Sequence, residues 1–268
     1  MNMAGWPLKK GTEYYTKAAA EALDIINSSG LSLTPNYADL WQEELKGNAN
    51  EHMFALHHSA KFKTASNYGK SYYPRDFAPN AGWADYYVNP EFMNKYPEDA
   101  RKEHNIMTSW LTKDGVVEWQ NSMDKLPAIS KYYGFDEGPA GKSAQANGLT
   151  PIYRYADVLL MYAEASNLAT GSVNGTALNA LQEVQQRANS TLTTTTDSQA
   201  FDKAVFAERG WEFFAEFNRW FDLVRREKVA EFKPTQYNSS LFKNNNHYYY
   251  PVPSEQIEMT GWTNNGGY

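Results

Sequence analysis

The sequence contains no cysteine, which excludes disulfide cross-links, thiolate metal sites and a cysteine nucleophile. It has no apolar run that approaches the roughly 18 residues of a membrane-spanning helix, and residues 1–15 lack the apolar core of a secretion signal. A glycine-rich phosphate loop and a Gly-x-Ser-x-Gly nucleophile turn are also absent. We therefore expect a soluble globular chain that uses no cofactor.

Positive charge is scarce as well. The 268 residues carry 25 lysines and arginines against 31 aspartates and glutamates, which gives a net charge of −6. Binding to nucleic acid requires a basic patch, so the composition argues against a nucleic-acid partner. The length is sufficient for a sizeable buried core in one or two domains.

Aromatic residues are abundant. They make up 15% of the chain, with 19 tyrosines and 8 tryptophans, although the mean hydropathy is only −0.67. Much of this aromatic surface must therefore lie beside polar residues. Tyr and Trp combine an apolar face with a polar tip and suit half-buried surfaces. Such rings can stack on sugars or can complete a small core, and composition leaves both uses open.

The spacing of apolar residues predicts two pairs of helices, which span residues 12–28, 36–45, 152–171 and 175–190. Gly30 follows the first helix as a terminating residue, and Asn36 is a suitable N-cap for the second. Each pair is joined by a short polar loop, which favours an antiparallel hairpin. The chain is therefore expected to be mostly α, with stacked tetratricopeptide-like helix hairpins. Weak alternation in residues 51–59 predicts a strand.

The stretch FAERGWEFFAEFNRWFDLVRREK, residues 206–228, combines aromatic rings with carboxylates and arginines. Its apolar positions follow the four-three-four spacing of a buried seam, which predicts one long helix bent near residues 215–218. Asp222 and Arg226 are spaced for an ion pair one turn apart.

Glu212 and Glu216 are also one turn apart and would repel each other unless a cation lies between them. We expect Arg154 or Arg187, from the neighbouring hairpin, to supply that cation. The charges of residues 206–228 are therefore predicted to link helices to one another.

Residues 61–150 show little periodicity and are rich in Tyr, Trp, Pro, Gly and Asn, so we expect an irregular region with a short helix near residues 91–96. Long irregular stretches that are ordered usually carry function. A sugar offers an apolar CH face and a rim of hydroxyls, so a binding site needs exposed rings beside polar groups. The segment YYPRDFAPNAGWADYY supplies both. The candidate glycan-binding residues are Tyr72, Tyr73, Arg75, Asp76, Asn80, Trp83, Asp85, Tyr86 and Tyr87.

Other chemistries receive less support from the sequence. His52, His57 and His58 lack the spacing of a zinc motif and are interpreted as ordinary surface histidines, so no metal is expected. A glycoside hydrolase needs two carboxylates that face each other across a cleft. The pairs Asp157/Glu164 and Glu212/Glu216 lie instead on helices rich in packing residues and arginine. No catalytic residue is therefore assigned.

Several motifs resemble the SusD/RagB family when they are taken together. Three are IYRYADVLLMYAEA (152–165), ERGWEFFAEFNRWFDLVR (208–225) and YYYPVPSEQI…NNGGY (248–268). The opening residues 3–41 and the segment NPEFMNKYPEDARKEH (89–104), with Arg101, are similar to middle segments of the family. The five occur in the family's order along nearly the whole chain.

This resemblance implies a non-catalytic, glycan-binding lipoprotein of the bacterial outer membrane that delivers oligosaccharide to a TonB-dependent, SusC-like transporter. Family members are longer and begin with a lipoprotein signal whose cysteine is acylated, so the chain is similar to their C-terminal part. Contact with the membrane would be made only by that lipid anchor, which this sequence lacks.

The expected organisation is a single SusD-like domain with four parts: a helical-repeat segment (1–60), an irregular ligand-facing insert (61–150), a helical core (151–230) and an extended C-terminal tail (231–268). We expect Tyr249, Val252 and Ile257 of the tail to insert into the helical core. Two alternatives to glycan capture stay open. One is a glycoside hydrolase that uses carboxylates of the aromatic region, and the other is a helical-repeat scaffold that binds protein.

Overall fold

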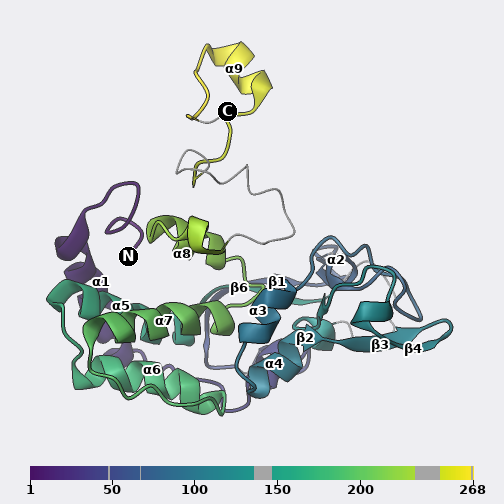
Figure 1. The fold of residues 1–268 in the computed structure, drawn as a ribbon, viewed down its shortest axis with the longest axis horizontal. Helices are drawn as coiled ribbons and strands as arrows, with labels where there is room; N and C mark the ends of the chain where they lie inside the picture. Colours follow the sequence, from purple (N-terminus) through teal and green to yellow (C-terminus); the bar gives the residue numbers. More distant parts are fainter. Residues whose placement is uncertain (48, 67, 136–146, 233–247, 267) are drawn as a thin grey trace.

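The computed structural model describes residues 1–47, 49–66, 68–135, 147–232, 248–266 and 268. Long helices occupy one end of an elongated body, and short helices and strands occupy the other (Figure 1). The strands form two-stranded antiparallel sheets, which pair β1 with β6, β2 with β5 and β3 with β4. Among the described residues, no helix is both long and apolar enough to cross a membrane.

The helical end is built around one buried helix. Helix α5 (Tyr155–Thr170) packs against α1 (Gly11–Ser28), α6 (Gly175–Arg187) and α7 (Ser198–Glu212). Because α5 is enclosed on several sides, it is apolar around most of its circumference. Residues Leu159, Leu160, Ala163, Leu181, Phe201 and Val205 form the centre of this core and are at most 1% exposed. The helices predicted over residues 12–28, 152–171 and 175–190 are confirmed, with a later start for α5.

The residues before α5 form a strand rather than the predicted first turn of a helix. Strand β6 (Gly148–Arg154) pairs with β1 (His52–His58), so the predicted strand at 51–59 is confirmed. Pairing with β1 explains the difference, because Tyr153 lies opposite Phe54 and Arg154 lies opposite His52.

The predicted helix at 36–45 is a single 3₁₀ turn, η1 (Tyr37–Trp41). The side chain of Asn36 caps it by accepting a hydrogen bond from the amide of Ala38 at 3.3 Å. Tyr37 and Trp41 are at most 1% exposed and belong to a second, aromatic core beneath the short elements.

The bend predicted near residues 215–218 is confirmed in place, but it is a complete break, so residues 206–228 do not form one long helix. Helix α7 ends at Glu212, and α8 (Arg219–Arg225) begins after a break in which Ala215 and Phe217 have φ values of 60° and 66°. The carbonyl of Phe214 accepts a hydrogen bond from Lys131 Nζ at 2.8 Å, and that of Ala215 accepts one from Tyr132 at 2.9 Å. These bonds turn the backbone out of the helix.

Residues 61–150 contain more regular structure than expected. The short helix predicted near 91–96 is α3 (Pro90–Lys95). The other elements are α2 (Tyr68–Tyr72), α4 (Ala100–Asn105), β2 (Ile106–Met107), β3 (Ser109–Thr112), β4 (Gly115–Glu118), η2 (Trp119–Asn121), β5 (Ala128–Ile129) and η3 (Tyr133–Phe135). The β3–β4 hairpin turns at Lys113-Asp114 before Gly115, whose φ of 119° is one that glycine adopts readily.

The C-terminal residues do not lie across the helical core, so that prediction is wrong. The rings of Tyr248 and Tyr249 contact Trp6, with centroids 5.1 and 4.7 Å apart. Beyond them, α9 (Ser254–Thr260) has no buried residue and lies apart from the body (Figure 1). The expected extended tail therefore includes a short helix. The 3₁₀ helix η5 (Val229–Phe232) precedes the tail, and residues 233–247 lie outside the described residues.

Candidate functional site

Two regions concentrate charged or aromatic side chains, and the first is a buried ion-pair network at the middle of the body. We call it the charged centre. It consists of Glu51, Asp99, Arg101, Lys131, Arg154, Arg187, Glu208, Glu212 and Glu216, whose side chains are at most 3% exposed. Its members come from α4, α6, α7, β6 and the connections between elements, so it joins the two ends of the molecule.

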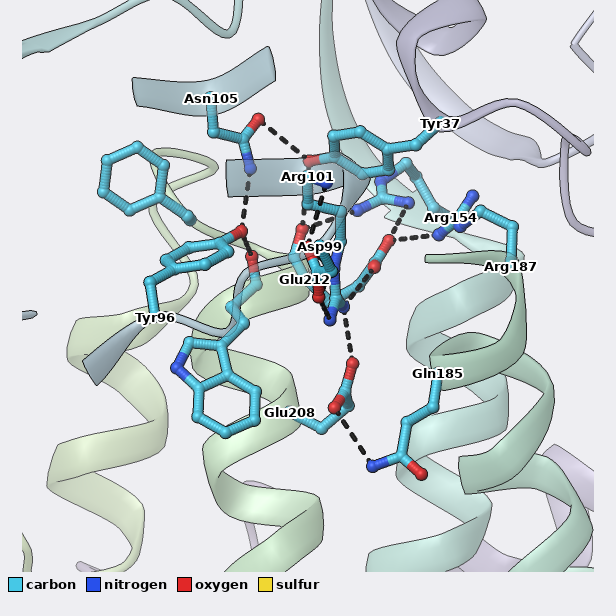
Figure 2. Close-up of polar contacts among 12 residues, drawn as sticks. Tyr37, Tyr96, Asp99, Arg101, Asn105, Arg154, Gln185, Arg187, Glu208 and Glu212 are labelled. Carbon is cyan, nitrogen blue, oxygen red and sulfur yellow. Dashed lines mark hydrogen bonds and ion pairs between the residues drawn. The ribbon is translucent and has the colours of Figure 1, made fainter. Parts of the chain in front are cut away.

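Glu212 lies at the junction of this network (Figure 2). Its carboxylate accepts hydrogen bonds from Arg101 at 3.0 Å, Arg154 at 2.9 Å and Arg187 at 2.5 Å. Burial opposes ionisation of Glu212, but the three guanidinium groups outweigh burial and hold its pKa well below the ordinary value. The prediction that Arg154 or Arg187 neutralises Glu212 and Glu216 is confirmed, since Arg154 also bonds Glu216 at 2.7 Å.

Two buried carboxylates of α5, Glu164 and Asp157, are also paired with arginine. Glu164 accepts hydrogen bonds from Arg225 and Arg226, each at 2.8 Å. Asp157 accepts one from Arg209 at 2.7 Å. A buried carboxylate that is held ionised by arginine cannot approach a sugar from solvent. Neither Asp157/Glu164 nor Glu212/Glu216 therefore has the open geometry of a glycosidase.

One predicted ion pair is replaced by others. Asp222 accepts hydrogen bonds from Arg209 at 2.8 Å and from Arg225 at 2.6 Å. Arg226 instead binds Glu164 and reaches Asp202 at 2.7 Å. The Asp222–Arg226 prediction is wrong because Arg226, the residue after α8, pairs with Glu164 on α5 and Asp202 on α7.

The three histidines make no cluster. The ring nitrogens of His58 lie 3.0 Å from the Thr64 carbonyl oxygen and 2.7 Å from the Thr150 hydroxyl. His57 is exposed and His52 is half-buried. Within the described parts of the chain, no group of three or more His, Asp or Glu side chains is arranged to hold a metal ion.

The second region is the aromatic loop, residues 72–87, at the end of the body that carries α2 and the β3–β4 hairpin (Figure 1). The structure separates its predicted rings into two groups. Trp83 and Tyr86 are 46% and 49% exposed, whereas Tyr72 and Tyr73 are 3% and 5% exposed. Buried rings have no free face for a ligand, so direct contact through Tyr72 or Tyr73 is not supported.

The buried tyrosines support the exposed rings. Tyr72 stacks on Tyr132 with ring centroids 5.4 Å apart, and Tyr86 packs on Tyr72 at the same distance. Tyr73 stacks on Phe77 at 4.8 Å. The loop therefore rests on the aromatic core.

Backbone hydrogen bonds hold Trp83 in place. Its amide donates to the carbonyl of Lys70 at 2.7 Å, and the flanking amides of Gly82 and Ala84 donate to Pro74 and Tyr73 at 2.8 and 3.1 Å. A side chain at position 82 would overlap the Tyr73 carbonyl, so the close approach requires glycine. The exposed indole is therefore presented by a fixed backbone.

Arg75 and Asp76 anchor the loop to the residues that follow the hairpin. Arg75 Nε donates a hydrogen bond to the Asp124 carboxylate at 2.6 Å. This carboxylate, with a smaller contribution from Tyr87, raises the pKa of Arg75. Asp76 accepts hydrogen bonds from the indole of Trp110 at 2.8 Å and from the amide of Met123 at 2.9 Å. Asp76 is thus a structural anchor, whereas the Arg75 side chain is 55% exposed.

An open groove of about 580 Å³ lies between the aromatic loop and the β3–β4 hairpin; we call it the hairpin groove. It is lined by Arg75, Asp76, Phe77, Ala78, Pro79, Ala81, residues 112–117, Asn121 and Met123. Of the nine predicted residues, only Arg75 and Asp76 line it. Asn80, Trp83, Asp85, Tyr86 and Tyr87 lie elsewhere on the loop, with Asp85 exposed and Asn80 and Tyr87 half-buried. Sequence reasoning missed the hairpin residues, although Asp114-Gly115 is a hairpin-turn signal.

Comparison with known proteins gives consistent matches. SusD-like protein P2 from Formosa agariphila is 26% identical over 95% of this chain and 56% of its own length. A SusD homologue from Bacteroides thetaiotaomicron superposes on the whole chain with a TM-score of 0.85 at 20% identity, and the match covers 61% of that protein. Surface glycan-binding protein A from the same species was solved in complex with laminarihexaose. Its structure matches 95% of this chain with a TM-score of 0.72 at 21% identity, and the match covers 60% of that protein.

The chain thus spans a little over half the length of these relatives. The two structural matches, below 25% identity, establish the fold. The sequence pattern that defines the SusD family matches residues 121–268, which is more than half of the chain and includes β5, β6 and helices α5 to α9. This protein belongs to the SusD family.

Proposed function

We propose that this chain contributes to the non-catalytic capture of oligosaccharide or polysaccharide at the bacterial outer surface. The observation that carries the proposal is the pair of exposed rings on the aromatic loop, Trp83 and Tyr86. Tyr86 packs on Tyr72, which stacks on Tyr132, and backbone hydrogen bonds fix the position of Trp83. A sugar can place its CH face on such a ring while its hydroxyls meet neighbouring polar groups. Asn80, Asp85 and the exposed guanidinium of Arg75 are the polar groups of the loop that serve this purpose.

The rigidity of the loop favours this function. Because the backbone bonds of Gly82, Trp83 and Ala84 hold the indole before ligand arrives, binding orders few side chains. A preformed site loses less conformational entropy than a mobile one. The structural similarity to a surface glycan-binding protein that holds laminarihexaose supports the same kind of ligand.

The wider biological role rests on family membership. We propose that the full protein is anchored to the outer membrane by a lipid and hands its glycan to a TonB-dependent, SusC-like transporter. The absence of catalysis is part of the proposal. It is supported by the buried, arginine-paired state of Glu164, Glu212 and Glu216.

The test is a panel of neutral and acidic polysaccharides cast into native affinity gels, with a parallel assay for released reducing sugar. Capture predicts retarded migration on at least one polysaccharide and no released sugar. Release of sugar would favour a glycosidase. Normal migration on every member of the panel would overturn glycan capture by this chain and favour the protein-binding scaffold.

A further inference from the structure

A second hollow lies beside the hairpin groove and contains none of the residues predicted from the sequence. It measures about 420 Å³ and is lined by residues of α4, β2, η3 and their connections. Tyr133 is the exposed ring in its wall, with 46% of its surface accessible. We call it the Tyr133 hollow.

The polar groups of this hollow are available to a ligand. Gln42, Glu103, Thr108 and Ser109 line it. Across the described part of the chain, the Gln42 amide and the Glu103 carboxylate make no hydrogen bond or ion pair with protein. A side chain at Gly134 would overlap the Gln42 amide, so glycine leaves room for that amide in the wall. An aromatic face thus lies beside an unengaged amide and an unengaged carboxylate.

The Tyr133 hollow and the hairpin groove meet at one pair of rings. Phe77 lines the groove, Tyr133 lines the hollow, and their ring centroids are 6.4 Å apart. Strand β3 also connects them, because Ser109 lies in the hollow and Thr112 lies in the groove. Three residue steps along a strand cover about 10 Å. A ligand that fills both hollows must therefore be an extended chain of several sugar units.

The charges favour a neutral ligand. Glu103 is the acidic side chain of the Tyr133 hollow, whose walls contain no lysine or arginine. In the hairpin groove, Arg75 is paired with Asp124, and Lys113 lies 3.8 Å from Asp114. In the Tyr133 hollow an anionic sugar would meet Glu103, with no lysine or arginine in the walls to offset the repulsion.

We propose that the Tyr133 hollow is a second sugar subsite and that a neutral, linear oligosaccharide binds across both hollows, over Phe77 and Tyr133. This proposal rests on the proposed glycan-capture function. It adds Tyr133, Gln42 and Glu103 to the ligand contacts and assigns the ligand class.

The test measures affinity against oligosaccharide length. Isothermal titration would use ladders of laminari-, malto- and xylo-oligosaccharides, with alginate oligosaccharides as the anionic series. Wild-type affinity should rise along one neutral ladder until both hollows are filled, and alginate should bind more weakly. Tyr133→Ala should lower the affinity of the longest members about tenfold, or about 1.4 kcal/mol, and leave the shortest members nearly unchanged.

Two further variants separate binding from folding. Tyr153→Ala is the matched control, because Tyr153 is a similarly exposed tyrosine (52%) on β6 that lines neither hollow. Its length profile should equal that of the wild type. Glu103→Gln keeps the side-chain shape at an exposed position and should weaken only the longer neutral members.

The outcomes are distinct. If the wild type binds a neutral ladder and both Tyr133→Ala and Glu103→Gln keep its length profile, the second subsite is refuted while glycan capture stands. A preference for alginate would overturn the ligand class. No binding to any ladder or polysaccharide would overturn the proposed function and the subsite with it.

Discussion

The ammonium group of Lys131 lies 2.6 Å from the carboxylate of Glu216, although the two residues are 85 positions apart in the sequence. Both side chains are buried, and the ammonium group also lies 4.4 Å from the ring centroid of Trp41. The same ammonium group binds the carbonyl of Phe214 in the break between α7 and α8. One cation thus fixes the backbone path between two helices and docks it onto the aromatic core.

Replacing this cation should destabilise the protein strongly. Lys131→Met would remove a partner from Glu216 and from the Phe214 carbonyl while keeping much of the side-chain volume. Removing one member of a buried ion pair costs about 3–5 kcal/mol, and the remaining bond from Arg154 to Glu216 places the expected loss near the lower end. Urea denaturation followed by circular dichroism measures it. Lys113→Met, at a side chain that is 89% exposed, is the control and should change stability by less than about 0.5 kcal/mol.

Lowering the pH should destabilise the folded protein by protonating Glu164. Burial opposes ionisation of this side chain, but Arg225 and Arg226 outweigh burial and lower its pKa from 4.5 to about 2. Because the folded-state pKa is depressed, the unfolded state binds more protons between these values. The stabilisation is therefore complete above pH 4.5 and is lost as the pH falls towards 2.

The matching variant is Glu164→Gln, which resembles the protonated side chain. At neutral pH it should be less stable than the wild type by about 3 kcal/mol, the equivalent of the pKa shift. The difference should shrink steadily as the pH is lowered through this window. Denaturation curves at a series of pH values measure it, and a difference that does not depend on pH would contradict the assignment. Binding by the folded fraction should be unchanged.

Truncation of Trp83 should affect binding rather than folding. The indole is 46% exposed, so Trp83→Ala should leave the melting temperature nearly unchanged. Loss of a stacking face should weaken oligosaccharide binding at least tenfold, or about 1.4 kcal/mol. Trp262→Ala, at another exposed tryptophan in the residues after α9, is the control and should bind like the wild type. Isothermal titration that finds equal affinity in both variants would move the site away from Trp83.

Gly82 should matter for both stability and binding. In Gly82→Ala the added methyl group would overlap the Tyr73 carbonyl, so the loop must shift. Overpacking of this kind costs about 1–3 kcal/mol, and displacement of the neighbouring indole should reduce affinity as much as Trp83→Ala does. Gly47→Ala is the matched control, because that position has open space around it. Normal binding by a folded Gly82→Ala variant would show that the position of the indole is not critical.

The sequence predicts the elements whose signals are local. Periodic apolar residues locate α1, α5 and α6, and Asn36 marks the start of a turn. The repulsion between Glu212 and Glu216 predicts a nearby cation, and the neighbouring hairpin offers Arg154 or Arg187 for that role; Arg101 and Lys131, which also bind these carboxylates, were not predicted. The local sequence predicts a bend near residues 215–218 but not a complete break, because the break depends on Lys131 and Tyr132, more than 80 positions away.

The candidate site was only partly predictable for a similar reason. Tyr72, Tyr73, Tyr86 and Tyr87 are alike in sequence, and no periodicity shows which rings face solvent. Their burial is decided by Tyr132 and Phe77, which stack beneath two of them. The Tyr133 hollow is formed by segments distant in the sequence, so composition alone gives no indication of it.

The charged centre has a consequence for how the chain folds. Glu212 takes its cations from residues 111, 58 and 25 positions away, on separate elements. A partly folded state that buries Glu212 before all three arginines arrive leaves a desolvated charge without full compensation, which is costly. The helical end and the strand-containing end therefore depend on each other for stability, and they should unfold together in one cooperative transition.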